Sequence, residues 1–489
     1  MIAPAQLPKF ALTTKVTEKL SVAPENAVQL SCASFLVTPC RNPLRSKELS
    51  WGDAAKQPPP HSGIHNAPKI VRGVYPIGVI PSLRQDFNSR FRPETYRAFL
   101  RNLDACVRTH VSFRVAETPV FLPRDLLAEM AAIGADLTHQ LVGDPDYLAL
   151  SRKAIPEAYR AADETPHPHF MTVDFGLVRE SDGRLAPRLV ELQAFPSVYA
   201  YQFVLAENYR SAFGLDSSLQ IFLNGNTEAS FWKLLHRVIT RGHHPENVVL
   251  TEIDPQHQKT LPDFRVTADR LGIRIVDIAE IVPEDRPGKL PRLCYRDGAR
   301  LVPIHRIYNR AIVDELIHKK IQLQFDYREH FDVEWAGHPN WYFHLSKFSI
   351  PFLDHPCVPP AVFLDDWFRG KGRDRLPGDR NQWILKPLFS FAGKGIQFAP
   401  TDEDLAAIPP RERHSYLLQQ RVQFENVIDT PHGPTQPEIR ILYLWPDGGK
   451  LEPVLPLIRL GRGKMMGVDH NRDLEWVGAS AAFIPQTSN

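Results

Sequence analysis

Apolar and polar residues follow two different periods along this chain, and each change of period marks a predicted element. From residue 92 to about 142, apolar residues recur at helical spacing, and residues 124–130 open a helix with Pro123 near its first turn. A second helical stretch is expected from residue 145 to about 162. Two helical segments therefore precede the first predicted strands.

A strand pattern replaces the helical one at Phe170. Residues 171–178 and 188–193 are predicted strands. Between them, Ser181-Asp182-Gly183-Arg184 is typical of a tight hairpin turn, because Asp-Gly accepts the positive φ that such turns require. The pattern thus predicts a β-hairpin directly after the helices.

A β-α-β unit is predicted at residues 247–278. Its parts are a strand at 248–250, a helix that ends at Leu271-Gly272, and a strand at 273–276. Asp297-Gly298 indicates another hairpin turn. The last third of the chain is again rich in strands, which are expected at residues 383–386, 416–420 and 439–443.

Residues 1 to about 65 are poorly patterned, and Pro58-Pro59-Pro60 marks their expected end. The chain has 44 prolines, many of them in connecting stretches, where a fixed φ favours ordered loops. We therefore expect four segments: a leader at 1–65, an N-terminal part with helices and the hairpin at 66–235, a β-α-β substrate-type domain at 236–330, and a C-terminal subdomain at 331–489.

Composition narrows the class of protein. Lys and Arg number 58 and Asp and Glu 56, so a formal net charge of +2 gives no electrostatic reason to expect a nucleic-acid or membrane partner. Five scattered cysteines form neither a disulfide framework nor a zinc-type pair, which favours a reducing compartment. With no apolar run of membrane-spanning length and no secretion-signal pattern, the expected location is cytoplasmic.

The predicted hairpin carries a group of carboxylates and amides. If Asp182-Gly183 forms a two-residue loop, Asp174 lies directly opposite Glu191, with Cβ atoms about 5 Å apart, and Gln193 points to the same face. Facing carboxylates destabilise a sheet unless a cation compensates, and these oxygen ligands suit Mg²⁺ on nucleotide phosphates. The alternatives are an exposed face screened by water, or a looser turn that shifts the register.

A glycine-containing loop follows a strand in the last third of the chain. Lys386-Pro387 ends the strand, Gly393-Lys394-Gly395 lies in the loop, and residues 396–398 begin another strand. Backbone N–H groups at glycines can close on phosphate oxygens, and a lysine adds a point charge. The loop is not a P-loop, since no Ser or Thr follows the lysine and no helix follows the loop. The alternative is an ordinary hairpin turn.

Two further features suit a nucleotide and an anion. The strand at 416–420 ends in Gln419-Gln420, whose amides and backbone groups suit an adenine, although most such strands are simply core. Arg440 and Arg459 each lie among apolar residues, where a charge needs a partner such as a phosphate or carboxylate. An internal salt bridge with Glu438 or Glu452 is the equal alternative.

Taken in order, these segments resemble the eukaryotic-type glutathione synthetases and, more loosely, the glutathionylspermidine synthases, which are circularly permuted ATP-grasp enzymes. The hairpin resembles the family's early carboxylate hairpin, with Gln193 in place of the usual Asn. Residues 306–310 resemble its aromatic-plus-arginine strand near the substrate. Residues 386–395, 418–422 and 438–440 resemble its ATP lysine and glycine loop, its hinge and a phosphate or metal strand, with Gln420 where a Glu often stands.

The resemblance implies an α/β fold of mixed sheets with a circularly permuted ATP-grasp architecture and an inserted β-α-β substrate domain. It implies an ATP- and Mg²⁺-dependent ligase that joins a small-molecule carboxylate to an amine through an acyl phosphate. The implied roles are ATP binding by Lys386, Gly393, Lys394, Gly395, Gln419, Gln420 and Val422, metal binding by Asp174, Glu191 and Gln193, catalysis by Arg440 and Arg459, and substrate binding by Arg306 and Arg310.

Three other predictions concern residues outside the segments that resemble this family. Trp341 is expected to be buried and packed, Lys347 is a candidate for reaching ATP from the other side, and the loop at 253–258 follows the carboxyl end of a strand, where ligands bind in open α/β sheets. Two other functions stay open. A degenerate nucleotide-binding scaffold would explain Gln193 and Gln420, and a phosphotransferase would use the same ATP site on a hydroxyl. The pattern predicts no oligomeric state.

Overall fold

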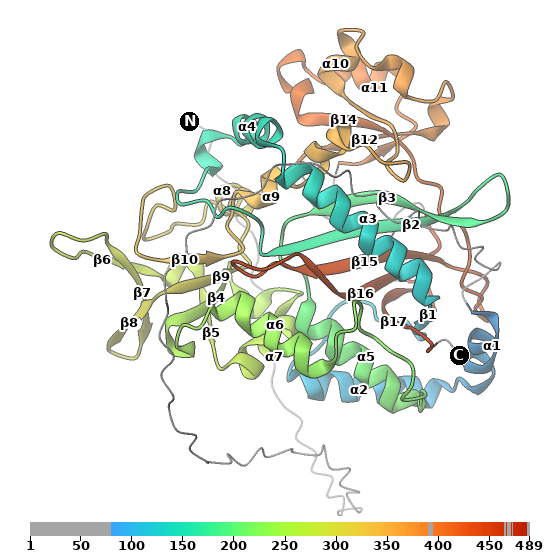
Figure 1. Ribbon diagram of the computed structural model, residues 1–489, viewed down its shortest axis with the longest axis horizontal. Coiled ribbons are helices and arrows are strands. Elements are labelled where there is room, and N and C mark those ends of the chain that lie inside the picture. Colours follow the sequence, from blue (N-terminus) through green and yellow to red (C-terminus); the bar gives the residue numbers. More distant parts are fainter. Residues whose placement is uncertain (1–79, 390–394, 464–465, 467–470, 472, 487–489) are drawn as a thin grey trace, which may run out of the picture. The chain divides into compact units, whose positions relative to one another are not determined.

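A computed structural model describes residues 80–389, 395–463, 466, 471 and 473–486 (Figure 1). The chain divides into two units, residues 1–70 and 71–489, and every described residue belongs to the second. The expected leader at 1–65 lies outside the described residues. Among the described helices, none is both long and apolar enough to cross a lipid bilayer.

The largest sheet joins strands from distant parts of the chain. Its order is β1-β17-β16-β15-β2-β3, with β1 parallel to β17 and all other neighbours antiparallel (Figure 1). The strands are β1 (Val120–Phe121), β2 (Phe170–Arg179), β3 (Leu185–Gln193), β15 (Gln436–Leu444), β16 (Glu452–Gly461) and β17 (Gly478–Phe483). The pairing of β2 with β15 therefore places the predicted early hairpin beside the predicted late strand.

Helices pack on this sheet. The helix α3 (Arg124–Val142) contacts β15 and β16, whereas α5 (Tyr199–Phe213) contacts β16 and β17 and is covered by α2 (Pro93–Val107). The predicted start of α3 directly after Pro123 is confirmed. The predicted second helix is wrong at its end, because α4 (Pro145–Ala154) stops before Pro156, whose ring cannot continue a helix. The remaining helix of this region is α1 (Pro81–Arg90).

The predicted β-α-β unit is confirmed and forms part of a second sheet of four parallel strands, ordered β10-β9-β4-β5. Its strands are β4 (Val248–Glu252), β5 (Arg274–Asp277), β9 (Arg306–Asn309) and β10 (Glu334–Ala336), and α7 (Leu261–Leu271) links β4 to β5. The predicted hairpin at Asp297-Gly298 is also confirmed, within a smaller sheet of β6 (Val282–Glu284), β7 (Arg292–Asp297) and β8 (Arg300–Ile304). Nearby helices are α6 (Glu228–Thr240) and α8 (Val313–His318).

A third sheet of four strands holds the predicted strands at 383–386 and 416–420, whereas the one predicted at 439–443 is β15 of the largest sheet. Its order is β11-β14-β12-β13, with β11 (Ala361–Phe363), β12 (Trp383–Pro387), β13 (Gln397–Phe398) and β14 (Tyr416–Gln420). A separate apolar cluster that includes Trp367, Leu385 and Leu418 fills the space between this sheet and its helices, α10 (Leu364–Phe368) and α11 (Asp402–Ala407). The short α9 (Trp341–His344) begins at Trp341, which is fully buried as predicted.

Candidate functional site

The predicted carboxylate hairpin forms, and Asp174 pairs with Glu191 as expected. The turn, however, is longer than the predicted two-residue loop. Arg179 pairs with Leu185 at the end of the strands, and Gly183 in the turn has a φ of +82°. A longer turn alone would have moved Asp174 out of register with Glu191.

A β-bulge restores the pairing. Phe175 pairs with Leu189 and Asp174 pairs with Glu191, so Val190 is an extra residue on β3. Such a bulge changes local twist and re-aims side chains. The sequence therefore predicted the correct pairing from an incorrect turn, since two departures of one residue cancel.

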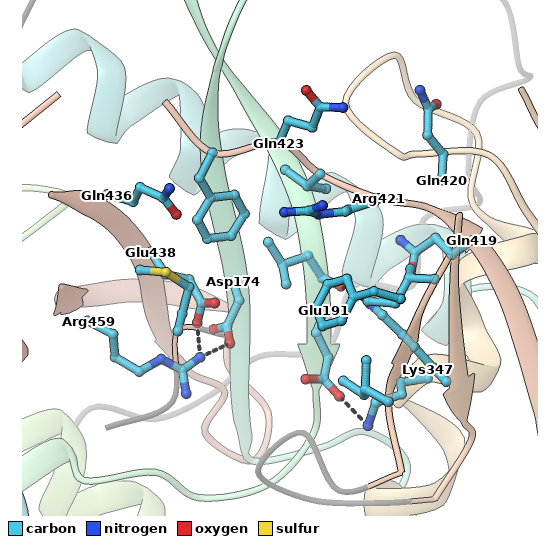
Figure 2. A pocket seen from close by; sticks show the side chains of 18 of the residues that line it. Asp174, Glu191, Lys347, Gln419, Gln420, Arg421, Gln423, Gln436, Glu438 and Arg459 are labelled. Atoms are coloured by element: carbon cyan, nitrogen blue, oxygen red, sulfur yellow. Dashed lines mark hydrogen bonds and ion pairs between the residues drawn. The ribbon is translucent and has the colours of Figure 1, made fainter. Parts of the chain in front are cut away.

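Asp174 is held by two arginines from neighbouring strands. Arg440 Nε and Nη2 donate to the two carboxylate oxygens of Asp174 at 2.5 and 2.7 Å. Arg459 Nη2 donates to Asp174 Oδ2 at 2.6 Å (Figure 2). Burial opposes ionisation of this carboxyl group, but the two guanidinium groups outweigh it and hold the pKa of Asp174 below its usual value. Asp174 is therefore an ionised, internally paired group.

The two arginines differ in the donors that they leave open. All three nitrogens of Arg440 are engaged, because Nη1 donates to Ser197 Oγ at 3.3 Å while the others bind Asp174. Arg459 also donates to Glu438, but its Nε and Nη1 have no hydrogen-bond partner among the described residues. Geometry thus singles out Arg459 as the arginine that can meet a ligand, and Arg440 as the one that positions Asp174.

Glu438 completes a buried group of two carboxylates and two guanidinium groups. It lies on β15, two residues before Arg440, and faces Arg459 in the β15–β16 register. Burial and the charge of Asp174 raise the pKa of Glu438 in spite of Arg459. The salt bridge between Arg459 and Glu438 that the sequence left open is present, and Arg459 still retains open donors.

Glu191 faces two lysines that come from a different part of the chain. Lys347 Nζ lies 2.9 Å from Glu191 Oε1 (Figure 2), and Lys386 Nζ donates to the carbonyl oxygen of Val190 at 3.3 Å. Burial works against the charge on Glu191, but the ammonium groups of Lys347 and Lys386 lower its pKa overall. The early carboxylate hairpin and the late lysine strand therefore meet, although they are separated by nearly two hundred residues.

Lys386 carries its charge in a buried position. Its side chain extends from β12 and is 6% exposed. Burial lowers the pKa of Lys386 to about 8, and the nearby Glu191 only partly offsets this effect. A buried lysine of this kind is primed for an anionic partner that would restore its full charge.

The predicted metal ligands fit Mg²⁺ unequally. Glu191 and Gln193 both line the cavity and offer a carboxylate and an amide oxygen, which suit an ion that takes its other ligands from phosphates and water. Both oxygens of Asp174 are occupied by arginines. Within the described residues, no three His, Cys, Asp or Glu side chains gather as a metal site. The chain's own contribution to a metal would therefore come from Glu191 and Gln193.

These residues line one cavity of about 860 Å³ between the six-stranded sheet and the sheet that carries β12 and β14. One end is charged and holds Glu191, Lys386 and Arg459. Another part is an apolar slot lined by Ile384, Ile396 and Phe398 together with Gln419, Gln420 and the strand's continuation, Arg421 to Phe424. A cavity of this size with an apolar slot beside convergent charges suits a nucleotide.

The predicted hinge lines the slot. Gln419, Gln420 and Val422 all border the cavity, and the N–H and carbonyl groups of Val422 have no hydrogen-bond partner among the described residues. Two of the predicted ATP-loop residues, Gly393 and Lys394, lie outside the described residues. Gly395 is described and has a φ of +73°, with Pro387 so near that a Cβ would lie 2.8 Å from its ring. The backbone conformation and the nearby ring of Pro387 therefore require glycine at position 395, at the end of the loop.

The predicted substrate arginines do not line this cavity. Arg306 is buried and donates to the carbonyls of Val238 and Ile239 at the end of α6, to Glu334 at 2.8 Å and to Asp447 at 3.0 Å. These contacts use the guanidinium group to join β9 to its neighbours. The substrate role of Arg306 stays a prediction without geometric support.

Arg310 is buried as well. Its Nη1 donates to Asp263 at 2.9 Å and to the carbonyl of Ser197 at 2.6 Å, and Asp263 in turn accepts from the first N–H groups of α5. This ion pair fixes the entry to α5 beside Ser197, which also accepts from Arg440. Arg310 therefore supports the site from behind, and its predicted contact with substrate is likewise unsupported.

Three residues that line the cavity are absent from the predicted site residues. Lys347 was only a candidate for reaching ATP, and Glu438 was predicted as a salt-bridge partner or as part of a phosphate or metal strand. Thr260, which precedes α7 and borders the cavity, lies just beyond the predicted loop at 253–258. Besides the resemblance, a signal for Glu438 was its spacing of two residues from Arg440, which puts both side chains on the same face of a strand.

Comparisons with known proteins give a likeness in fold alone. No family model matches the chain, and no curated protein matches it. Among solved structures, a glutathione synthetase-like effector from Globodera pallida in its apo form is similar, with a TM-score of 0.50 and 11% sequence identity. The match covers 80% of this chain and 98% of that chain. The mixed α/β architecture is thus similar to a glutathione synthetase-like fold.

Proposed function

We propose that this chain is an ATP- and Mg²⁺-dependent carboxylate–amine ligase that works through an acyl phosphate on an amino acid or small peptide. The observation that carries the proposal is one cavity in which Lys386, from the sheet of β12, faces Glu191, from the sheet of β3. The likeness to a glutathione synthetase-like fold supports it. A circularly permuted ATP-grasp architecture is part of the proposal.

In this proposal the nucleotide base occupies the apolar slot beside Ile384, and the phosphates lie at the charged end. Lys386 and Lys347 bind phosphate oxygens, so that Lys347 leaves its contact with Glu191 when the nucleotide enters. Glu191 and Gln193 would then hold Mg²⁺, which supplies charge neutralisation at the phosphates. Gly393 and Lys394 keep their predicted role over the phosphates.

The chemical step needs positioning and charge stabilisation more than covalent help from the protein. The substrate carboxylate attacks the γ-phosphorus, and ADP leaves. The open Nε and Nη1 donors of Arg459 stabilise negative charge on the acyl phosphate, while Arg440 keeps Asp174, and through it Arg459, in place. The amine then attacks the acyl carbon, and phosphate leaves with the bond electrons.

The test is a screen for ADP release with amino acids and short peptides as acid and amine. Glu191→Ala and Lys386→Met should each abolish ADP release, whereas Lys371→Met, an exposed lysine outside the cavity, should leave it unchanged. Hydroxylamine should trap the intermediate as a hydroxamate, because only an activated acyl group reacts in this way.

Two outcomes would redirect the proposal. Transfer of the γ-phosphoryl group from ATP to a hydroxyl acceptor, with release of ADP but without any hydroxamate, would favour a phosphotransferase. If the protein binds ATP but releases no ADP with any acid and amine, a nucleotide-binding scaffold is favoured. The complete internal pairing of Asp174 is the structural support for that alternative.

A further inference from the structure

Gln419 is a buried amide on the strand β14. It lies in the middle of β14 and is 1% exposed, and neither its Oε1 nor its Nε2 has a hydrogen-bond partner among the described residues. Buried amides are almost always hydrogen-bonded, because an unpaired buried polar atom costs stability. A fold that keeps two such atoms on one side chain indicates that a ligand supplies their partners.

The side chain is directed at the nucleotide cavity. Gln419 pairs across the strands with Ile384, so both side chains lie on the face of the sheet that also carries Lys386. All three residues line the cavity, and Figure 2 shows Gln419 on the opposite side of it from Asp174 and Arg459. Gln419 thus stands at the inner wall of the apolar slot, away from the arginine cluster.

The chemistry of an amide selects among nucleobases. The amide of a glutamine side chain presents one donor, its NH₂ group, next to one acceptor, its carbonyl oxygen. The edge of adenine that carries N7 and the 6-amino group presents one acceptor and one donor, whereas the same edge of guanine presents two acceptors. An amide can therefore make two hydrogen bonds with adenine on this edge, but only one of the two with guanine. The backbone of Val422, which has no hydrogen-bond partner in the described part of the chain, remains available for the opposite edge of the base.

We infer that Gln419 reads the N7 and 6-amino edge of adenine and so determines the selectivity of the site for ATP over GTP. The inference rests on the proposed function, since it requires a nucleotide base in the slot. Beyond the proposed function, it assigns the Gln419 side chain to N7 and the 6-amino group of adenine and explains why guanine would bind more weakly.

The experiment is calorimetric titration of the full chain with Mg²⁺ complexes of four nucleotides: ATP, 7-deaza-ATP, purine riboside triphosphate, which lacks the 6-amino group, and GTP. For the unchanged protein we expect each of the three analogues to bind roughly 5- to 100-fold more weakly than ATP. For Gln419→Met we expect ATP and 7-deaza-ATP to bind with equal affinity, because no amide remains to contact N7.

A second measurement separates a specific role from a folding defect. Gln419→Met and Gln419→Leu remove two unpaired buried polar atoms, so both variants should melt at a higher temperature than the unchanged protein when no nucleotide is present. Normal discrimination against 7-deaza-ATP in a stably folded Gln419→Met variant would overturn the inference. So would equal binding of ATP and 7-deaza-ATP by the unchanged protein.

The outcomes also distinguish this inference from the proposed function. If the unchanged protein releases ADP but does not distinguish 7-deaza-ATP from ATP, the ligase proposal stands and the role of Gln419 is wrong. If no nucleoside triphosphate binds at all, both fail together.

Discussion

Burial makes the charge of Lys386 sensitive to pH in the range where enzymes are assayed. With a pKa of about 8, its ammonium group is mostly charged at pH 7 and mostly neutral at pH 9 in the nucleotide-free protein. Phosphate binds the charged form, so affinity for Mg²⁺-ATP should fall as pH rises through 8. We expect a loss of about tenfold between pH 7 and pH 9, measured by calorimetric titration.

The matched control is Lys386→Arg. A guanidinium group stays charged throughout this range, so the affinity of that variant should not change with pH through this residue. An equally steep decline in Lys386→Arg would assign the pH dependence to another group and contradict the prediction.

Asp174 is predicted to matter for stability as well as for the site. Asp174→Asn removes the charge that pairs with Arg440 and Arg459 inside the sheet. Breaking a buried pair on one side leaves uncompensated charge, so we expect the free energy of unfolding to fall by about 3–5 kcal/mol. Urea denaturation measures this change.

Asp182→Asn is the control for Asp174→Asn. Asp182 lies on the exposed turn of the same hairpin, and within the described residues its side chain hydrogen-bonds to Arg184 alone. Its substitution should leave the denaturation midpoint nearly unchanged. Equal effects of the two substitutions would show that the arginine cluster around Asp174 does not stabilise the fold.

At the residue scale, the charged residues that meet in the site could be predicted from the sequence, but not all of their hydrogen bonds could. The meeting of Asp174 with Glu191 could be predicted from the hairpin turn, and that of Glu191 with Lys386 from the order of segments in the resembled family. The engagement of Arg306 could not be predicted in full, because two of its acceptors are carbonyls at the end of α6, 67 and 68 residues earlier in the chain. Hydrogen bonds to a distant backbone leave no residue type to recognise in the sequence.

At the scale of elements, the hairpin of β2 and β3 shows what a turn motif predicts and what it does not. Asp182-Gly183 correctly indicated a turn, but the loop length depends on how the strand ends twist, and the bulge at Val190 has no residue signature. The correct pairing of Asp174 with Glu191 therefore followed from two compensating departures.

The same element yields a prediction about the wall of the cavity. Gly176 lies on β2, and a Cβ there would come within 2.2 Å of the ring of Phe424, which borders the cavity. Gly176→Ala should therefore displace Phe424 and the strand continuation that carries it. We expect weaker binding of Mg²⁺-ATP and, from overpacking, about 1–3 kcal/mol lower stability.

Gly378→Ala serves as the comparison for Gly176→Ala. A Cβ at Gly378 meets nothing within 4 Å, so this change should affect neither property. Calorimetric titration and thermal melting of the two variants in parallel would compare their affinities for Mg²⁺-ATP and their stabilities. Normal nucleotide affinity in a destabilised Gly176→Ala variant would mean that Phe424 does not shape the nucleotide slot.

At the scale of the molecule, the site depends on two sheets that no local pattern could place together. Lys386 on β12 donates to the carbonyl of Val190 on β3 across 196 residues of chain, and hydrophobic periodicity carries no information about such distant partners. The order of the segments, compared with that of the resembled family, supplied this part of the prediction.

A ligand that bridges the two sheets should stabilise both. We expect Mg²⁺-ATP at a hundred times its dissociation constant to stabilise the native state by about 2.7 kcal/mol, seen as a rise in melting temperature. At the same ATP concentration, Lys386→Met should show a much smaller rise because its affinity is lower. A melting temperature that is the same with and without Mg²⁺-ATP would contradict binding between the sheets.

The strand order of the six-stranded sheet also bears on how the protein is made. Its early strand β2 pairs with β15, and its early strand β1 pairs with β17, which ends at Phe483. During translation, the β2–β3 hairpin stays unpaired along this edge until β15 has emerged from the ribosome, and β1 stays unpaired until β17 (Gly478–Phe483) has emerged. Unpaired strand edges can form hydrogen bonds with other chains, so synthesis of this protein should depend on chaperones that shield its first half.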